Sequence, residues 1–181
     1  MTCIVGLIDN NKVYMGGDSA SVAGWDLQLR TDWKVFRNGP FLMGFTSSWR
    51  MGQLLRFKLE PPSLFKTDGT KKDIYQYMVT DFIEAVRDCL KAGGYATKIN
   101  EEERGGIFLV GIEGRLFFID SDYQVGELLD GYTAVGCGDQ IARGVLYATK
   151  GKEPEWRIRL ALEAAEHLSA GVRGPFVFLT T

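Results

Sequence analysis

Strand patterns and helix patterns occupy separate blocks of this sequence, and that order restricts the fold more than any other feature. Apolar runs joined by short turns come first, two amphipathic segments come next, and both blocks then repeat before a last apolar run. Strands joined by short turns pair antiparallel, whereas parallel strands need a crossover between them. The sequence therefore predicts an α+β fold, a four-layer αββα sandwich of two antiparallel sheets flanked by helix pairs. Its 181 residues predict a single domain spanning residues 1–181.

The strand predictions rest on apolar, often β-branched runs and on the turn residues between them. Asp9-Asn10-Asn11, Asn38-Gly39 and Glu113-Gly114 each separate two such runs and mark hairpins. The predicted strands are Thr2–Ile8, Val13–Met15, Lys34–Phe36, Phe41–Met43, Gly106–Ile112, Arg115–Asp120, Tyr132–Val135 and Phe176–Leu179. Ser19–Asp32 is predicted to form a loop or weak strands. Ser63–Lys72 is predicted to be a polar connector, and Asn100–Arg104 a charged loop.

Four helices are predicted from apolar residues at helical spacing. Ser48 is the expected N-cap of the first helix, and Pro61-Pro62 ends it. The others are Asp73–Lys91, Gln140–Thr149 and Pro154–Leu168. The longest carries an i, i+4 apolar stripe made of Ile74, Met78, Phe82, Val86 and Leu90.

Composition and charge exclude several classes of protein. A net charge of −2 gives no general attraction to nucleic acid or to an anionic membrane, and no apolar run reaches the roughly 20 residues of a membrane span. Cys3, Cys89 and Cys137 have no metal-ligand spacing, so we expect reduced thiols and a cytoplasmic protein without a metal. His167 is the only histidine, which argues against a histidine-based triad. No phosphate-binding glycine loop occurs, and no cofactor is expected.

The candidate chemistry centres on Thr2. Removal of Met1 would leave a hydroxyl and a free α-amine on one residue, and that amine, with a pKa of about 8 in model compounds, can accept the hydroxyl proton. A Lys34 ammonium nearby would keep the amine neutral, and Asp18 would hold the lysine in place. The backbone N–H of Gly44 could stabilise an oxyanion.

Each of these residues also has an ordinary structural explanation. Asp18 follows two glycines and could be a turn or cap residue, and Lys34 could be a solvated charge. Gly44 could simply permit two sheets to cross closely. Cys137 could be a reactive thiol, although a buried, inert cysteine is the more common case.

The spacing of these motifs resembles that of the proteasome β-type N-terminal-nucleophile hydrolases. Met1-Thr2 opens a strand, Gly16-Gly17-Asp18-Ser19 ends the next, and Lys34-Val35-Phe36 and Gly44-Phe45 come after them. Val135-Gly136-Cys137-Gly138 before a helix is similar to the family's Gly-Ser-Gly stretch. The pattern is most similar to the small bacterial and phage relatives of HslV and Anbu.

The resemblance implies a role for each matching residue. Thr2 would be the nucleophile and its amine the base, Lys34 and Asp18 the adjacent charge pair, and Gly44 the oxyanion donor. Cys137 stands where the family has a serine whose hydroxyl helps to hold the amine, and a thiol is a weaker donor. Residues 169–174 also lack the aspartate that the proteasome has before its last strands.

The resemblance further implies a threonine endopeptidase that acts on polypeptides, inside a homo-oligomeric ring or double ring with an ATP-dependent unfoldase as a possible partner. Removal of Met1 would be its only maturation step. Two alternatives stay open: a catalytically inactive scaffold subunit, and an amidase acting on a small non-peptide substrate. Trp25, Trp33 and Trp49 could seal contacts between subunits or pack in the core.

Overall fold

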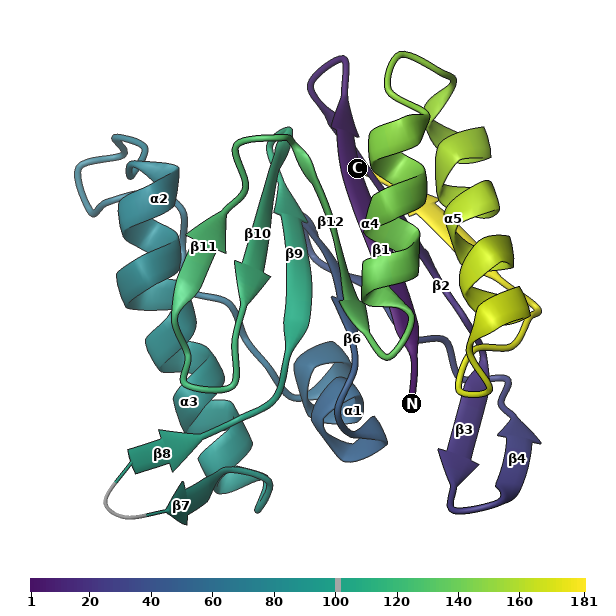
Figure 1. The fold of residues 1–181 in the computed structure, drawn as a ribbon. Coiled ribbons are helices and arrows are strands. Elements are labelled where there is room, and N and C mark those ends of the chain that lie inside the picture. The colour runs from purple at the N-terminus through teal and green to yellow at the C-terminus, as the bar shows by residue number, and fades with distance from the viewer. Residues whose placement is uncertain (100–101) are drawn as a thin grey trace.

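A computed structural model describes residues 1–99 and 102–181 of the chain (Figure 1). Its first sheet has four strands in the order β12-β1-β2-β13, and every neighbouring pair is antiparallel. The strands of this sheet are β1 (Cys3–Asp9), β2 (Lys12–Gly17), β12 (Tyr132–Gly136) and β13 (Val177–Thr180). Strands from the two ends of the sequence thus lie side by side, with the C-terminal strand pairing against β2.

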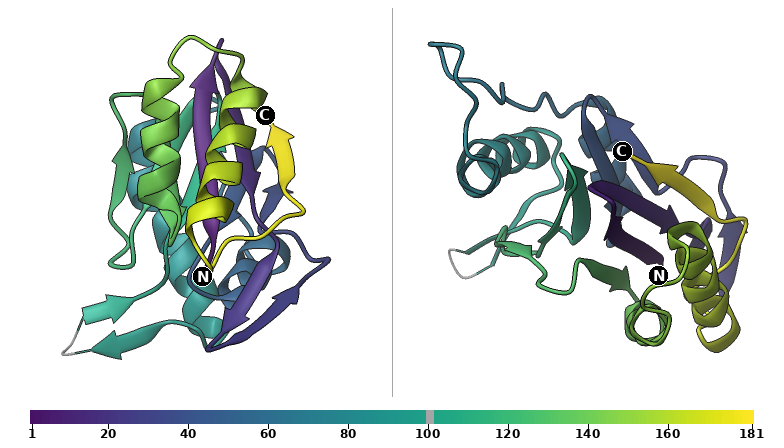
Figure 2. Two further views of the ribbon diagram at one scale, coloured as in Figure 1. Left: turned by 45° about the vertical axis from the view of Figure 1, so that its right-hand side comes forward. Right: turned by 90° about the horizontal axis from the view of Figure 1, so that it is seen from above.

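The second sheet has five antiparallel strands in the order β11-β10-β9-β6-β5. These strands are β5 (Val35–Asn38), β6 (Phe41–Phe45), β9 (Phe108–Ile112), β10 (Arg115–Ile119) and β11 (Val125–Glu127). Two separate ribbons are formed by β3 (Ala20–Ala23) with β4 (Asp26–Leu29) and by β7 (Thr97–Ile99) with β8 (Glu102–Arg104). Both ribbons project from the lower edge of the molecule, on opposite sides (Figures 1 and 2).

Helices lie on the outer side of each sheet. The helical segments are α1 (Trp49–Phe57), α2 (Ile74–Tyr77), the π-helical η1 (Met78–Phe82), α3 (Ile83–Ala92), α4 (Asp139–Ala148) and α5 (Pro154–Leu168). One apolar cluster joins α1, α2, η1 and α3 to the five-stranded sheet, and a second joins α4 and α5 to β1 and β12. A third cluster lies between the sheets and consists of Ile4, Val13, Met15, Val35, Leu42, Leu109, Leu116 and Val135.

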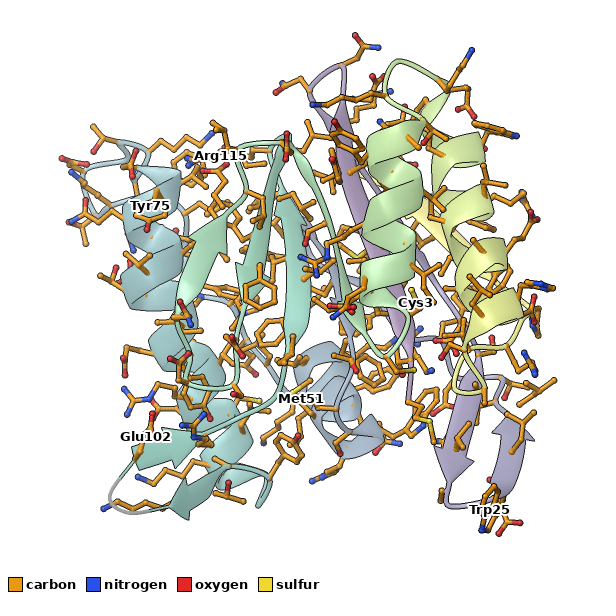
Figure 3. The ribbon with its side chains drawn as sticks, in the orientation of Figure 1. Cys3, Trp25, Met51, Tyr75, Glu102 and Arg115 are labelled. Atoms are coloured by element: carbon orange, nitrogen blue, oxygen red, sulfur yellow. The ribbon has the colours of Figure 1, made fainter. Side chains whose placement is uncertain are left out.

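Burial on both faces explains why β1 is apolar throughout. Cys3, Val5 and Leu7 belong to the cluster beneath α4 and α5, whereas Ile4 belongs to the cluster between the sheets. Figure 3 shows Cys3 near the lower end of β1, at the foot of these helices. Alternate side chains of one strand therefore fill two different cores, as the period of two in a strand requires.

The predicted hairpins and the two antiparallel sheets are confirmed, and so are the four predicted helical regions. Ser48 caps α1 as predicted, because its side chain accepts a hydrogen bond from the Arg50 N–H. Residues 19–32 form weak strands rather than a loop. Glu102–Arg104 is a strand, so the prediction of a charged loop over Asn100–Arg104 is wrong for that part. The first two residues of the predicted loop lie outside the described part of the chain. The short strands β7 and β11 were not predicted.

The longest predicted helix is interrupted by a π-turn. Its apolar stripe is buried throughout, but residues 78–82 are π-helical, and the Thr80 hydroxyl donates to the Gln76 carbonyl there. A π-turn inserts one residue into the helical repeat and rotates the next turn of the helix about its axis. The i, i+4 spacing of the stripe fits a helix that is locally underwound in this way.

Close contact between β2 and α5 predicts the effect of two glycine substitutions on stability. A Cβ at Gly16 would lie 2.5 Å from Ile158 Cγ2, whereas a Cβ at Gly144, exposed within α4, would meet nothing within 4 Å. We expect Gly16→Ala to lower the free energy of unfolding by about 1–3 kcal/mol through overpacking. Gly144→Ala should raise it by about 0.5–1 kcal/mol, because alanine favours a helix interior. Urea unfolding of both variants checks this, and a destabilised Gly144→Ala would contradict it.

Candidate active site

Thr2, Asp18 and Cys137 meet at one end of the four-stranded sheet. Cys3 pairs with Gly136 on one side, and Ile4 pairs with Gly17 on the other, so the residue just before β1 lies between the ends of two strands. The Asp18 N–H donates to the Cys3 carbonyl at 3.3 Å, and the Cys3 N–H donates to Asp18 Oδ1 at 3.0 Å. The antiparallel register thus brings together residues that are far apart in the sequence.

Asp18 and Lys34 form a buried ion pair. Lys34 Nζ lies 2.8 Å from Asp18 Oδ1, and the two side chains are 1% and 0% exposed. Asp18 Oδ2 accepts from the Ala20 N–H at 3.0 Å and from the Arg173 N–H at 3.4 Å. Charges buried this deeply persist only when they are paired and hydrogen-bonded. The structure therefore assigns Asp18 to the lysine and excludes the solvated position considered for Lys34.

Thr2 contacts the same cation through the residue that precedes it. The Met1 carbonyl oxygen accepts a short hydrogen bond from Thr2 Oγ1 and a longer one, of 3.4 Å, from Lys34 Nζ. Hydroxyl and ammonium therefore converge on one oxygen atom. Thr2 itself is 5% exposed, and both hydrogen bonds to the Met1 carbonyl are partly buried.

Burial affects the titration of the groups around Thr2. It lowers the pKa of the Lys34 ammonium below its ordinary value, and the neighbouring Asp18 carboxylate opposes that shift. Burial also raises the pKa of the Cys3 thiol, with a smaller contribution from Asp18. Cys3 is consequently an inert thiol beneath the site, whereas Lys34 is a cation that gives up its proton more readily than a solvated lysine does.

Cys137 lies against the backbone nitrogen of Thr2. Its Sγ accepts from the Thr2 N–H at 3.3 Å and donates to the Thr2 carbonyl at 3.4 Å, and the Ser169 hydroxyl donates to it at 3.6 Å. The residue is exposed, so the expectation of a buried cysteine is wrong. Gly136 permits this approach, because it has a φ of +102° and a Cβ there would lie 2.2 Å from the Thr2 carbonyl oxygen.

Gly44 does not join this group. It lies inside β6, paired with Val35 on one side and Leu109 on the other, so its backbone is part of the sheet ladder. A Cβ at Gly44 would lie 2.6 Å from Ile4 Cγ2 and 2.7 Å from Met15 Sδ. The glycine therefore lets two sheets approach closely, and the position does not support the predicted oxyanion role.

The loop after β6 reaches the site instead. A pocket of about 320 Å³ opens beside Thr2, lined by Met1, Thr2, Ser21, Val22, Lys34, Phe45, Thr46, Ser47, Ser48, Trp49 and Arg50. Ser47 has a left-handed backbone with a φ of +67°, uncommon for a residue other than glycine. Its hydroxyl accepts from the Ile107 N–H at 3.0 Å, and within residues 1–99 and 102–181 its own N–H has no hydrogen-bond acceptor. Sequence analysis did not identify Ser47 as a residue of this pocket. The sequence feature that could have identified it is the run of small polar residues, Thr46-Ser47-Ser48, between the strand and the helix.

No clustered group of metal ligands was found in the described part of the chain, and none of its helices is long and apolar enough to cross a membrane. The groups gathered around Thr2 are its own hydroxyl, the Asp18–Lys34 ion pair and the Cys137 thiol.

Comparison with solved structures identifies the fold. BPH of Thiobacillus denitrificans, in a structure with epoxomicin, superposes with a TM-score of 0.79 at 18% identity over 99% of this chain and 98% of its own. HslV of Trypanosoma brucei gives 0.68 at 18% identity over 99% and 98%. An Anbu (Gly-1) mutant from Hyphomicrobium gives 0.68 at 17% identity over 98% and 80%. The chain has the proteasome-like fold of HslV and Anbu.

Sequence comparison alone does not reach these proteins, because no protein-family model and no curated protein sequence matches the chain. The resemblance inferred from motif spacing is thus confirmed by shape. HslV and BPH match this chain along nearly their whole lengths, so their fold is present without large additions.

The buried pair predicts how an Asp18→Asn variant will behave. Asparagine preserves the shape but leaves the Lys34 ammonium without a counter-charge, so we expect the free energy of unfolding to fall by about 3–5 kcal/mol at neutral pH. Because burial lowers the pKa of Lys34 in the folded state, the unfolded chain binds more protons, and stability must rise with pH. Urea unfolding at about pH 7 and about pH 9.5 should show that the free energy of unfolding of Asp18→Asn partly recovers at the higher pH. That pH lies closer to the ordinary lysine pKa of about 10.4.

The matched control is the double variant Asp18→Asn/Lys34→Met. It removes the unpaired charge along with its partner, so it should be more stable than Asp18→Asn alone and show no recovery with pH. Equal stability of the single variant and the wild type at neutral pH would contradict the assignment of this pair.

Proposed function

We propose that this chain is a threonine-type peptidase subunit that cleaves peptide bonds through an acyl-enzyme on Thr2 once Met1 has been removed. The observation that carries the proposal is the convergence of the Thr2 hydroxyl and the Lys34 ammonium on one oxygen, next to the buried Asp18 carboxylate. The fold shared with HslV supports the proposal.

The proposed reaction is built from the atoms around Thr2. The free α-amine accepts the proton of Oγ1 while that oxygen attacks the substrate carbonyl carbon. Lys34 favours the charged oxygen and keeps the amine neutral, and Cys137 Sγ, now 3.3 Å from the Thr2 nitrogen, holds the amine in place. The Ser47 N–H replaces Gly44 as the proposed oxyanion donor.

Collapse of the tetrahedral intermediate completes the proposed cycle. The bond between the carbonyl carbon and the amide nitrogen breaks, and the leaving nitrogen takes the proton held by the α-amine. Water then attacks the resulting ester on Thr2, with the same amine as base, and the carboxylate product leaves with the hydroxyl restored. No metal or redox partner is needed for this balance.

With Met1 attached, the chain cannot run this reaction. The Thr2 nitrogen is then an amide, which has no lone pair free to accept a proton, and the Met1 carbonyl occupies the position beside Lys34. Met1 also lies close to Gly171 and lines the pocket next to Thr2. Processing would therefore uncover both the base and part of the pocket.

The proposal extends to the assembly. Within the subunit we expect the four-layer αββα arrangement, supported by three separate apolar clusters. We also expect a homo-oligomeric ring or double ring in the cytoplasm that admits polypeptide substrates, with an ATP-dependent unfoldase as a possible partner. Trp25 points outward from the tip of the β3–β4 ribbon (Figure 3) and Trp33 is 48% exposed, as contacts between subunits would need. Trp49 instead packs against the core.

An inactive scaffold subunit is the second candidate. It is favoured by the thiol of Cys137, a weak hydrogen-bonding partner for the Thr2 nitrogen, and by the hydrogen bonds that seat the Met1 carbonyl in the site. The third candidate, an amidase for small substrates, has no structural observation in its favour beyond the shared site.

Epoxomicin tests the peptidase proposal. Its epoxyketone needs both the hydroxyl and the free amine of an N-terminal threonine, so the processed chain should lose the mass of Met1 and then gain one inhibitor mass on Thr2. Intact-mass spectrometry before and after incubation measures both changes. The Thr2→Ser variant should retain the adduct because it keeps both groups, and Thr2→Ala should lose it.

Two results would decide for the scaffold. One is a population that keeps Met1 entirely when it is expressed with an active methionine aminopeptidase. The other is a processed chain that forms no adduct while Thr2→Ala is equally unreactive.

Native mass spectrometry tests the assembly separately. The expected species has a mass that is a multiple of the 20.2 kDa chain, with the ring stoichiometry given by that multiple. Replacing Trp25 with serine should lower the population of this species, because the substitution removes the apolar surface that the indole would bury in a contact between subunits. A protein that remains monomeric at micromolar concentration would contradict the ring.

A further inference from the structure

The peptide bond between Met1 and Thr2 lies in a seat formed by residues from distant parts of the chain. Its carbonyl oxygen accepts from Thr2 Oγ1 and, at 3.4 Å, from Lys34 Nζ. Its nitrogen donates to Cys137 Sγ at 3.3 Å. Gly171 lies against the Met1 side chain, since a Cβ there would be 2.5 Å from Met1 Cβ and 2.7 Å from its Sδ. Both polar atoms of the bond are therefore engaged inside the protein.

Exposure of the Met1 side chain does not make this bond accessible. Met1 is 55% exposed, but Thr2 is 5% and Cys3 0% exposed. The Cys3 N–H donates to Asp18 Oδ1, and the Cys3 carbonyl accepts from the Asp18 N–H. A hydrolase has to polarise the carbonyl oxygen of the bond and bring water to its carbon. It could do so here only after the first residues of the chain leave the sheet, which is a local unfolding event.

The seat is completed late in the order of the sequence. Strand β12, which pairs with the start of β1, spans Tyr132–Gly136, and Cys137 and Gly171 follow it. Figure 1 shows the N-terminus at the lower end of β1, close to the loops that precede α4 and follow α5. At about 5–20 residues per second, synthesis takes roughly 10–30 s to go from Met1 to Gly171. Until then the seat is incomplete, and the Met1–Thr2 bond is open to an enzyme.

We propose that Met1 has to be removed before the chain completes its fold, and that the folded chain with Met1 attached is a locked, inactive form that a methionine aminopeptidase does not process. This inference rests on the proposed function, in which the amine of Thr2 is the base. It adds the order of events: processing competes with folding, and the outcome of that competition sets the fraction of chains that become active.

The reaction that has to come first is the hydrolysis of one peptide bond by an aminopeptidase. The oxygen of water bonds to the Met1 carbonyl carbon, and the bond from that carbon to the Thr2 nitrogen breaks. Methionine leaves with the new carboxylate, and the nitrogen takes a proton to become the free α-amine. Lys34 and Cys137 then face that amine and not an amide.

Cell-free translation tests the order of events directly. The full chain is made in a reconstituted system without methionine aminopeptidase, and the enzyme is added either at the start or after synthesis and folding are complete. Intact mass should show loss of Met1 in the first arm and at least about tenfold slower loss in the second, because hydrogen bonds of the seat have to open first. Equal loss in both arms would overturn the proposal, and so would retention of Met1 in both.

A synthetic peptide with the first six residues, Met-Thr-Cys-Ile-Val-Gly, is the matched substrate control. It has the same bond without the seat, so the aminopeptidase should cleave it rapidly in both arms. Rapid cleavage shows that the enzyme is active and accepts threonine after methionine. Slow loss from the folded chain is then due to the fold and not to the sequence.

Gly171→Ala is expected to open the seat. The added Cβ would lie 2.5 Å from Met1 Cβ and 2.7 Å from Cys137 Sγ, so we expect it to displace Met1 and to speed its removal from the folded chain about tenfold. Gly144→Ala, at an exposed position where a Cβ meets nothing within 4 Å, is the control and should stay slow. If Gly171→Ala does not fold, Cys137→Ala, which removes the acceptor of the Thr2 N–H, should also speed the removal. An unchanged rate in a folded seat variant would contradict the role of the seat.

Failure of this inference and failure of the proposed function give different results. Chains processed during synthesis should form the epoxomicin adduct, whereas chains that folded with Met1 should form none after the aminopeptidase is added. If processed chains form no adduct, the peptidase function fails, and the mass of Met1 still decides the order of processing. Loss of Met1 from the folded chain at the rate of the peptide, or without any aminopeptidase, would overturn the inference alone.

Discussion

The buried ion pair between Asp18 and Lys34 is the interaction on which the rest of the site depends. Taking two charges out of water costs several kcal/mol for each ion, so the pair exists only because the fold supplies the missing hydrogen bonds. Asp18 receives them from backbone N–H groups of Cys3, Ala20 and Arg173 in addition to the Lys34 ammonium. Three separate segments of chain thus have to be in place before the cation can be buried beside Thr2.

Close packing of the two sheets serves the same end. Gly44 and Gly16 occur where a side chain would collide with a facing strand or helix, and Gly136 occurs where one would collide with the Thr2 carbonyl. Small residues at these points let β1 lie buried on both faces and place its first residue at a fixed position. The residues that close the core therefore also fix the position of Thr2.

The comparison with HslV, Anbu and BPH shows how little sequence identity this arrangement requires. At 17–18% identity most side chains differ, yet the fold covers nearly the whole chain. Patterns of burial tolerate many apolar substitutions, whereas a buried charge pair tolerates few. Motif spacing around Thr2, Asp18 and Lys34 pointed to the fold although no family model matches.

The sequence by itself determined most of the strands, the helical regions and the spacing of Thr2, Asp18 and Lys34, because periodicity and turn residues are local signals. Only the tertiary structure decided that Gly44 lies in the sheet ladder, that Ser47 is left-handed beside the pocket, that Cys137 is exposed and that Arg30 covers Trp49. Those outcomes depend on which strand edges pair and which loops meet across the sheets. Such contacts join distant segments, and no local pattern encodes them.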